Sequence, residues 1–175
     1  MKKILLVKHK IFTWNNISDQ LKGWRSEGDK IVFTNGVFDL IHTGHIDYLA
    51  KAADCANRLV VGLNGDESVK RLNKGPARPI KDQDTRAIIL ASLQFVDAVI
   101  LFDEDTPYEL IKLVQPDVLV KGGDYDPNEM DPSSKKYIVG SDLVIANGGE
   151  VKSIEFVPGH STSRLEEKII QANLR

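Results

Sequence analysis

Short apolar segments alternate with helical patterns along most of this 175-residue chain. Apolar runs at 31–34, 59–63, 98–102 and 118–120 predict buried strands, and the segments between them have apolar residues at helical spacing. Parallel strands need a crossover connection, so repeated strand–helix–strand units predict a parallel sheet with right-handed crossovers. We therefore expect an α/β fold, a Rossmann-like doubly wound parallel sheet with helices on both faces.

Weaker patterns suggest the remaining elements. Residues 143–145 and 151–156 read as two more short strands, and residues 161–173 as a closing helix. Thr106 is expected to cap a helix whose first residue is Pro107. Two prolines and a glycine exclude a regular element at 73–80. We expect residues 1–30 to form an N-terminal extension with one helix, and residues 31–175 to form the main domain.

Composition excludes several classes of protein. The formal net charge is −2, which argues against a general nucleic-acid-binding surface. A single cysteine, Cys55, excludes an internal disulfide framework and a cysteine zinc site. No apolar run approaches the length of a membrane span, and the apolar run near the N-terminus is too short for a signal peptide. The expectation is a cytoplasmic protein with no membrane or nucleic-acid partner.

The residues that follow strands are the candidates for a site, because ligands of open α/β sheets bind outside the carboxyl ends of the strands. The segment from Thr34 to His45, TNGVFDLIHTGH, follows the first core strand and enters a helix. Gly44 lets a phosphate approach the backbone, and the helix N-terminus favours an anion. His42 and His45 can donate hydrogen bonds to phosphoryl oxygens in a transition state. A bare helix cap is the less favoured interpretation, because both histidines stand at a strand-to-helix switch.

A second candidate opens the last helix, where Ser161, Thr162 and Ser163 follow Pro158-Gly159-His160. Taken alone, these hydroxyls favour a plain N-cap over an anion site.

Residues 31–49, IVFTNGVFDLIHTGHIDYL, resemble the nucleotidyltransferase superfamily with the His-x-Gly-His signature, in its cytidylyltransferase-like branch. The resemblance covers about residues 31–168. It implies that the motif binds the phosphates of a nucleoside triphosphate and that His42 and His45 stabilise the transition state as pyrophosphate leaves. It also implies that residues 161–163 hold the β- and γ-phosphates.

Four further segments resemble the heptose 1-phosphate adenylyltransferases of ADP-heptose synthesis: LNGDESVKRL at 63–72, RPI at 78–80, FDEDTP at 102–107 and VKGGDY at 120–125. Phe156 stands where many CTP-using relatives have an arginine. The chain departs from the heptose enzymes at His160, where cysteine is common, and at 126–139. The resemblance implies transfer of AMP from ATP to a sugar 1-phosphate. Two alternatives stay open: a CTP-dependent cytidylyltransferase acting on glycerol 3-phosphate or a similar polyol or amino-alcohol phosphate, and a non-catalytic nucleotide-binding module.

The predicted site residues form three groups. The catalytic group is His42, His45 and Lys121. The nucleotide-binding group is Thr34, Asn35, Gly36, Val37, Phe38, Asp39, Gly44, Arg78, Arg86, Lys121, Gly122, Gly123, Asp124, Ser161, Thr162 and Ser163. The acceptor-binding group is Asp39, Asn64 and Asp66.

Other interpretations of these residues remain open. Arg86 can instead pair with Asp82 on its own helix, and Asp66 can be an ordinary acid at a helix N-terminus. We expect no metal site on the protein, since Mg²⁺ arrives with ATP, and we interpret residues 103–105 as a loop before a helix. The resemblance also implies a homodimer.

Overall fold

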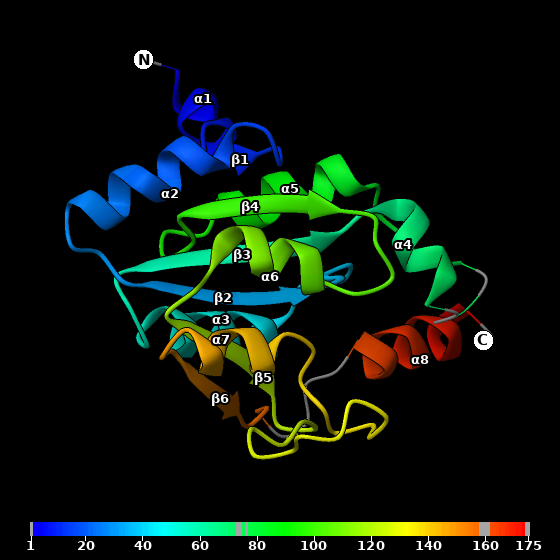
Figure 1. Ribbon diagram of the computed structural model, residues 1–175. Helices are drawn as coiled ribbons and strands as arrows, with labels where there is room; N and C mark the ends of the chain where they lie inside the picture. Colours follow the sequence, from blue (N-terminus) through cyan, green and yellow to red (C-terminus); the bar gives the residue numbers. More distant parts are fainter. Residues whose placement is uncertain (1, 73–74, 76, 158–161, 174–175) are drawn as a thin grey trace.

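The computed structural model describes residues 2–72, 75, 77–157 and 162–173, except for the side chains of residues 163, 164, 167 and 173. In this part of the chain, six parallel strands form one sheet in the order β1-β4-β3-β2-β5-β6 (Figure 1). The strands are β1 (Ile11–Phe12), β2 (Ile31–Gly36), β3 (Arg58–Asn64), β4 (Ala98–Phe102), β5 (Val118–Gly122) and β6 (Glu150–Ile154). The predicted doubly wound α/β fold is confirmed.

The strand order reverses between β2 and β5. From β2 the chain moves outward through β3 to β4, and then returns to the other side of β2 with β5. The register places Phe33 of β2 opposite Val60 of β3 on one side and Leu119 of β5 on the other. The connection that follows β2 runs toward β3, and the connection that follows β5 runs the opposite way, toward β6. The two connections separate, so a crevice opens at the carboxyl ends of β2 and β5.

Helices cover both faces of the sheet (Figure 1). They are α1 (Lys3–Lys8), α2 (Ile17–Ser26), α3 (Thr43–Ala53), α4 (Asp66–Arg71), α5 (Gln83–Ala91), α6 (Tyr108–Val114), α7 (Ser141–Ala146) and α8 (Thr162–Asn173). One buried cluster joins α2, α6 and α7 to the sheet, and a second joins α3 and α5 to its other face. Successive residues of β2 alternate between the clusters, because neighbouring side chains of a strand point to opposite faces.

Two predicted elements are wrong. Residues 143–145 belong to helix α7, in which Ser141 and Val144 are buried one turn apart. A short apolar run does not distinguish a strand from a buried helix turn. Helix α6 begins at Tyr108 with Pro107 in the N-cap position, so Thr106 lies outside the helix, in the wall of the pocket described below.

The N-terminal segment contains more structure than the single helix expected from its sequence. Helices α1 and α2 flank β1, which pairs with β4 and so extends the sheet. A two-residue strand carries no detectable period, so sequence patterning misses it.

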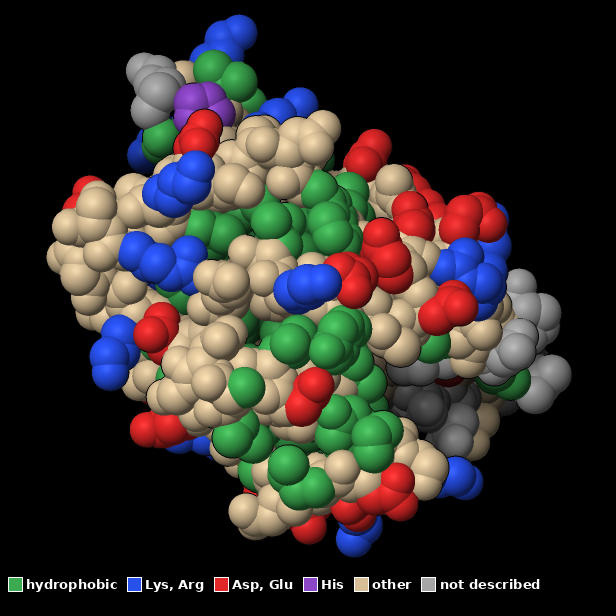
Figure 2. Space-filling model, in the orientation of Figure 1, with side chains coloured by type: hydrophobic (Ala, Val, Ile, Leu, Met, Phe, Trp, Pro, Cys, Tyr) green, Lys and Arg blue, Asp and Glu red, His purple; other side chains and the backbone are tan. Residues whose placement is uncertain are grey.

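Apolar and acidic side chains gather in different parts of the surface. On the face shown in Figure 2, apolar side chains reach the surface around α6 and α7, and acidic side chains gather at the edge beside α4. Within the described residues, no helix has both the length and the apolar character needed to cross a bilayer.

Candidate functional site

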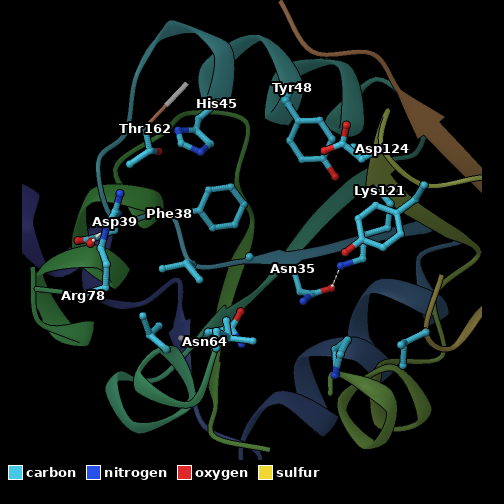
Figure 3. A pocket seen from close by; sticks show the side chains of 18 of the residues that line it. Asn35, Phe38, Asp39, His45, Tyr48, Asn64, Arg78, Lys121, Asp124 and Thr162 are labelled. Atoms are coloured by element: carbon cyan, nitrogen blue, oxygen red, sulfur yellow. Dashed lines mark hydrogen bonds and ion pairs between the residues drawn. The ribbon is translucent and has the colours of Figure 1, made fainter. Parts of the chain in front are cut away.

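A pocket of about 790 Å³ lies at the carboxyl ends of the strands, where the strand order reverses. This volume is within the range of small-molecule sites. Residues from the ends of β2, β3 and β5 line it together with residues of α3 and α8 (Figure 3). The pocket therefore lies where the strand pattern predicted a site.

The loop after β2 forms the centre of the pocket. Phe38 has a positive φ of 48°, an uncommon backbone conformation for a residue with a side chain. Its ring lies against Gly36, where an added Cβ would approach the ring to 2.9 Å. Gly36 thus leaves room for the ring, which extends between Asn64 and His45 (Figure 3).

The two histidines of the motif lie together at the start of α3. His42 occupies the N-cap position without a side-chain capping bond, and its ring stacks on His45 with centroids 4.0 Å apart. His45 lines the pocket, and its ring meets Phe38 edge-on at 5.5 Å. The simple helix-cap interpretation of His42 is therefore wrong.

His45 is uncharged at neutral pH. Burial lowers its pKa to about 4, the charge of His42 contributes in the same direction, and the Leu40 carbonyl has a smaller opposite effect. A neutral imidazole at a helix N-terminus can still donate one hydrogen bond. A bound polyphosphate would supply the negative charge that favours its protonation.

The ends of β2 and β5 are joined by a polar contact. Lys121 Nζ donates a hydrogen bond to Asn35 Oδ1, and the ammonium lies 5.5 Å from the centroid of the Tyr125 ring. All three residues line the pocket. Lys121 thus places a positive charge in the crevice between β2 and β5, where an anionic ligand can reach it.

Asp39 organises the opposite wall. Its side chain is 1% exposed and accepts hydrogen bonds from Arg78 Nη1 at 2.9 Å and from the backbone N–H groups of Ile80 and Lys81. Burial alone would raise the pKa of Asp39, but these hydrogen bonds outweigh it and lower the pKa. Arg78 Nη2 also pairs with Glu166 of α8 at 2.8 Å. Both anions that Arg78 contacts here are thus carboxylates of the chain itself, at the wall of the pocket.

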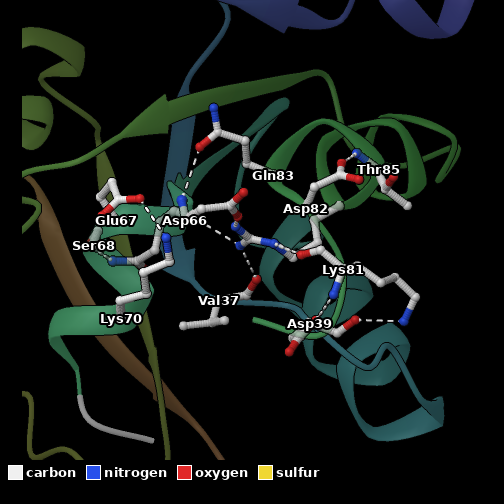
Figure 4. Close-up of polar contacts among 12 residues, drawn as sticks. Val37, Asp39, Asp66, Glu67, Ser68, Lys70, Lys81, Asp82, Gln83 and Thr85 are labelled. Atoms are coloured by element: carbon white, nitrogen blue, oxygen red, sulfur yellow. Dashed lines mark hydrogen bonds and ion pairs between the residues drawn. The ribbon is translucent and has the colours of Figure 1, made fainter. Parts of the chain in front are cut away.

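Arg86 lies beneath the pocket instead of in it. Its side chain is fully buried and donates to the carbonyls of Lys81, Val37 and Asn64 at 2.7–3.0 Å and to Asp66 Oδ1 at 2.7 Å. Figure 4 labels three of these partners, Val37, Asp66 and Lys81. The guanidinium therefore joins the ends of β2 and β3 to the loop before α5. Its ion pair is with Asp66, and the alternative partner Asp82 instead caps α5 through the Thr85 N–H.

Two aromatic residues that the sequence reasoning did not place in the site also line the pocket. Tyr48 lies one helical turn after His45 on α3 and shares a 2.7 Å hydrogen bond with the buried Thr34, and burial raises its pKa. The ring centroids of Phe156 and Tyr48 are 6.0 Å apart. The Phe156 ring also lies directly against Gly122, where any Cβ would overlap with it. The i,i+3 spacing after His45 is a sequence signal that could have identified Tyr48.

The structure brings most of the predicted site residues together. The pocket lining includes Asn35, Gly36, Val37, Phe38, Asp39, His45, Asn64, Arg78, Lys121, Gly122, Asp124 and Thr162. Thr34, Asp66 and Arg86 support the site from outside the lining, while Gly44 is buried in α3 and Gly123 packs against Glu155. Ser161 and the side chain of Ser163 lie outside the described residues. Further lining residues were not predicted: Tyr48, Val69, Leu72, Asp105, Thr106, Pro107, Tyr125, Val139, Phe156 and Glu166.

No group of three or more histidine, cysteine, aspartate or glutamate side chains is arranged to hold a metal ion in the described part of the chain. Asp39 is engaged with Arg78 and backbone N–H groups, and Asp66 with Arg86. Both carboxylates are thus engaged by groups of the chain itself.

Comparison with known proteins agrees with this geometry. Residues 33–167 match the cytidylyltransferase-like family. The bifunctional protein HldE of Wolinella succinogenes is 52% identical over 162 residues, which are 93% of this chain and 31% of that protein. The bifunctional protein HldE of Rhodopseudomonas palustris is 49% identical over 150 residues, 86% of this chain and 29% of that protein. The chain thus spans about three tenths of the length of these curated relatives.

A solved structure shows the same fold. The lipopolysaccharide core biosynthesis protein of Thermoplasma volcanium is 30% identical, with a TM-score of 0.55, and the match covers 74% of this chain and 98% of that one. The family match spans nearly the same residues as the predicted resemblance and includes the whole TNGVFDLIHTGH segment, from Thr34 to His45. The chain belongs to the cytidylyltransferase-like family.

Proposed function

We propose that this protein is a nucleotidyltransferase that transfers AMP from ATP to a sugar 1-phosphate, with heptose 1-phosphate as the acceptor. One observation carries the proposal: His45 at the N-terminus of α3 and Lys121 at the end of β5 line one pocket at the strand-order reversal. The identity to HldE proteins supports the choice of a heptose acceptor.

In the proposed reaction, an oxygen of the acceptor phosphate attacks the α-phosphorus of ATP. A bond forms between that oxygen and phosphorus, and the bond to the pyrophosphate oxygen breaks. The attacking phosphate is already ionised near neutral pH, so the reaction needs no general base. The protein contributes positioning and stabilisation of developing charge.

Two helix N-termini and the end of β5 have roles in this proposal. The N-termini of α3 and α8 bind the phosphates, with His45 donating to the oxygens that gain charge as pyrophosphate leaves. The positive charge of Lys121 reduces the repulsion between the acceptor phosphate and the α-phosphate of ATP. Mg²⁺ enters as part of the MgATP substrate and neutralises the triphosphate.

The aromatic side of the pocket favours ATP over CTP. Phe156 occupies the position where CTP-using relatives have an arginine, and its exposed ring lies beside Gly122. An apolar ring offers a stacking surface to a purine and no hydrogen bond to a cytosine edge. We therefore propose a kcat/KM preference for ATP.

The decisive experiment measures pyrophosphate release with ATP and CTP, each combined with heptose 1-phosphate, glycerol 3-phosphate and phosphocholine. Release with ATP and heptose 1-phosphate is expected. Preferential release with CTP would replace the proposal with the cytidylyltransferase alternative, and nucleotide binding without release in every combination would favour a non-catalytic module. A homodimer in the cytoplasm stays a prediction, which sedimentation and cell fractionation test.

A further inference from the structure

One end of the pocket is lined by hydrogen-bond acceptors that the proposed transfer of AMP does not use. Asn64 ends β3, and Asp105 and Thr106 follow β4. Figure 3 shows Asn64 at the opposite end of the pocket from His45 and Thr162, with Phe38 between them. This polar end therefore lies apart from His45 and Thr162, which the proposed function assigns to the phosphates.

The side chain of Asn64 is held in one orientation. It is only 6% exposed, and its Nδ2 donates a 2.9 Å hydrogen bond to Ser68 Oγ. Ser68 is itself 2% exposed and donates to the Glu104 carbonyl at 3.3 Å. Since Nδ2 is engaged, Oδ1 is left as the acceptor of this amide. Because Asn64 lines the pocket, this oxygen is placed to accept a hydrogen bond from a donor group of a ligand.

The loop after β4 is fixed beside Asn64. Arg71 of α4 pairs with Asp105 at 2.7 Å and also donates to the Asp103 carbonyl. Gly65 completes the contact, because a Cβ there would overlap with the Asp103 carboxylate. The loop thus reaches the pocket in a defined position and brings Asp105 and Thr106 to its wall.

The chemistry of this end suits hydroxyl groups and not phosphates. An amide oxygen, a carboxylate and a hydroxyl accept hydrogen bonds, and the nearby cation Arg71 is already paired with Asp105. A phosphate placed there would face the Asp105 carboxylate. Sugar hydroxyls, in contrast, donate hydrogen bonds to all three groups.

The geometry of the reaction points to the same end. Attacking and leaving oxygens lie roughly in line on opposite sides of the transferred phosphorus. With pyrophosphate leaving toward His45 and Thr162, the acceptor approaches from the side of Asn64.

We propose that Asn64, Asp105 and Thr106 determine acceptor specificity by binding the hydroxyl groups of the sugar. This inference rests on the proposed function, and it adds the loop after β4 and the bond from Ser68, which positions Asn64.

Steady-state kinetics with heptose 1-phosphate, together with calorimetry of ATP binding, test the inference in the variants Thr106→Val and Asp105→Asn. Loss of one hydrogen bond is expected to raise the KM for the sugar phosphate about three- to tenfold, while the Kd for ATP changes less than twofold. Glu104→Gln is the matched control, because Glu104 is exposed on the same loop as Asp105 and Thr106 but does not line the pocket. It should leave both constants unchanged.

An acceptor phosphate without hydroxyl groups gives a second readout. Phosphocholine, used as a competitor of heptose 1-phosphate, should have inhibition constants that differ less than twofold between Thr106→Val and the wild type. Wild-type KM for heptose 1-phosphate in both variants, or a rise confined to the Kd for ATP, would overturn the inference while the transferase assignment stands. Absence of pyrophosphate release by the wild type with every sugar phosphate would overturn both.

Discussion

Replacing Arg86 by methionine tests whether the buried guanidinium holds the pocket together. Methionine keeps much of the side-chain volume and removes every donor. The four hydrogen bonds of Arg86 would be lost, leaving the carbonyls of Val37, Asn64 and Lys81 and the carboxylate of Asp66 without this partner.

The size of the effect follows from these groups. A buried polar group left unsatisfied costs about 1–3 kcal/mol, but Asp66 is 28% exposed on its side chain and regains water. Local relaxation reduces the sum, and breaking a buried ion pair by removing one partner typically costs about 3–5 kcal/mol. We expect Arg86→Met to lower the free energy of unfolding by about 3–5 kcal/mol, a large share of the stability of a domain this size.

Urea unfolding followed by circular dichroism measures this change. Asp66→Asn keeps the three carbonyl contacts of Arg86 and should cost about 1–2 kcal/mol. Arg71→Met is the matched control, because the ion pair of this half-exposed arginine with Asp105 is worth less than about 1 kcal/mol. An Arg86→Met protein within 1 kcal/mol of the wild type would show that the carbonyls find other partners, and the proposed role of the guanidinium would be refuted.

Three further predictions concern the pocket itself. Replacing His45 with alanine should lower kcat about 10²–10³-fold in a folded protein, and near-normal turnover would remove His45 from the mechanism. Burial lowers the pKa of His45 from 6.5 to about 4, so the unfolded state binds more protons than the folded state below pH 6.5. Between pH 7 and pH 5 the free energy of unfolding should therefore fall by about 1–2 kcal/mol more in the wild type than in His45→Ala. Equal losses in urea titrations would contradict this. Gly122→Ala should displace the half-exposed Phe156 ring and raise the KM for ATP severalfold, while the free energy of unfolding falls by less than about 1 kcal/mol. An unchanged KM would exclude a role of the ring in base binding.

The sequence was sufficient to predict the fold class and the end of the sheet at which the pocket lies. The strands from Ile31, Arg58, Ala98 and Val118 are strongly apolar and separated by helical patterns, and the site follows from the rule that ligands bind at their carboxyl ends. Glycines at 36 and 122 lie where a side chain or a ligand must approach the backbone, so they were readable as parts of the site. Local signals of this kind survive in a single sequence because they act over a few residues.

The partners of the charged residues were decided by tertiary structure. Arg86 and Asp66 are 20 positions apart, and Arg78 reaches Glu166 across 88 positions, so no local pattern links either pair. The sequence analysis assigned Arg78 and Arg86 to the nucleotide-binding group, whereas their exposure and their partners depend on how the loop before α5 folds under β2 and β3. The same holds for Leu143 to Ile145, whose apolar character suits a strand or a helix until packing against β5 and β6 selects the helix. Periodicity determines which residues are buried, whereas the partner of each buried polar group depends on contacts between distant segments, and those exist only once the sheet has assembled.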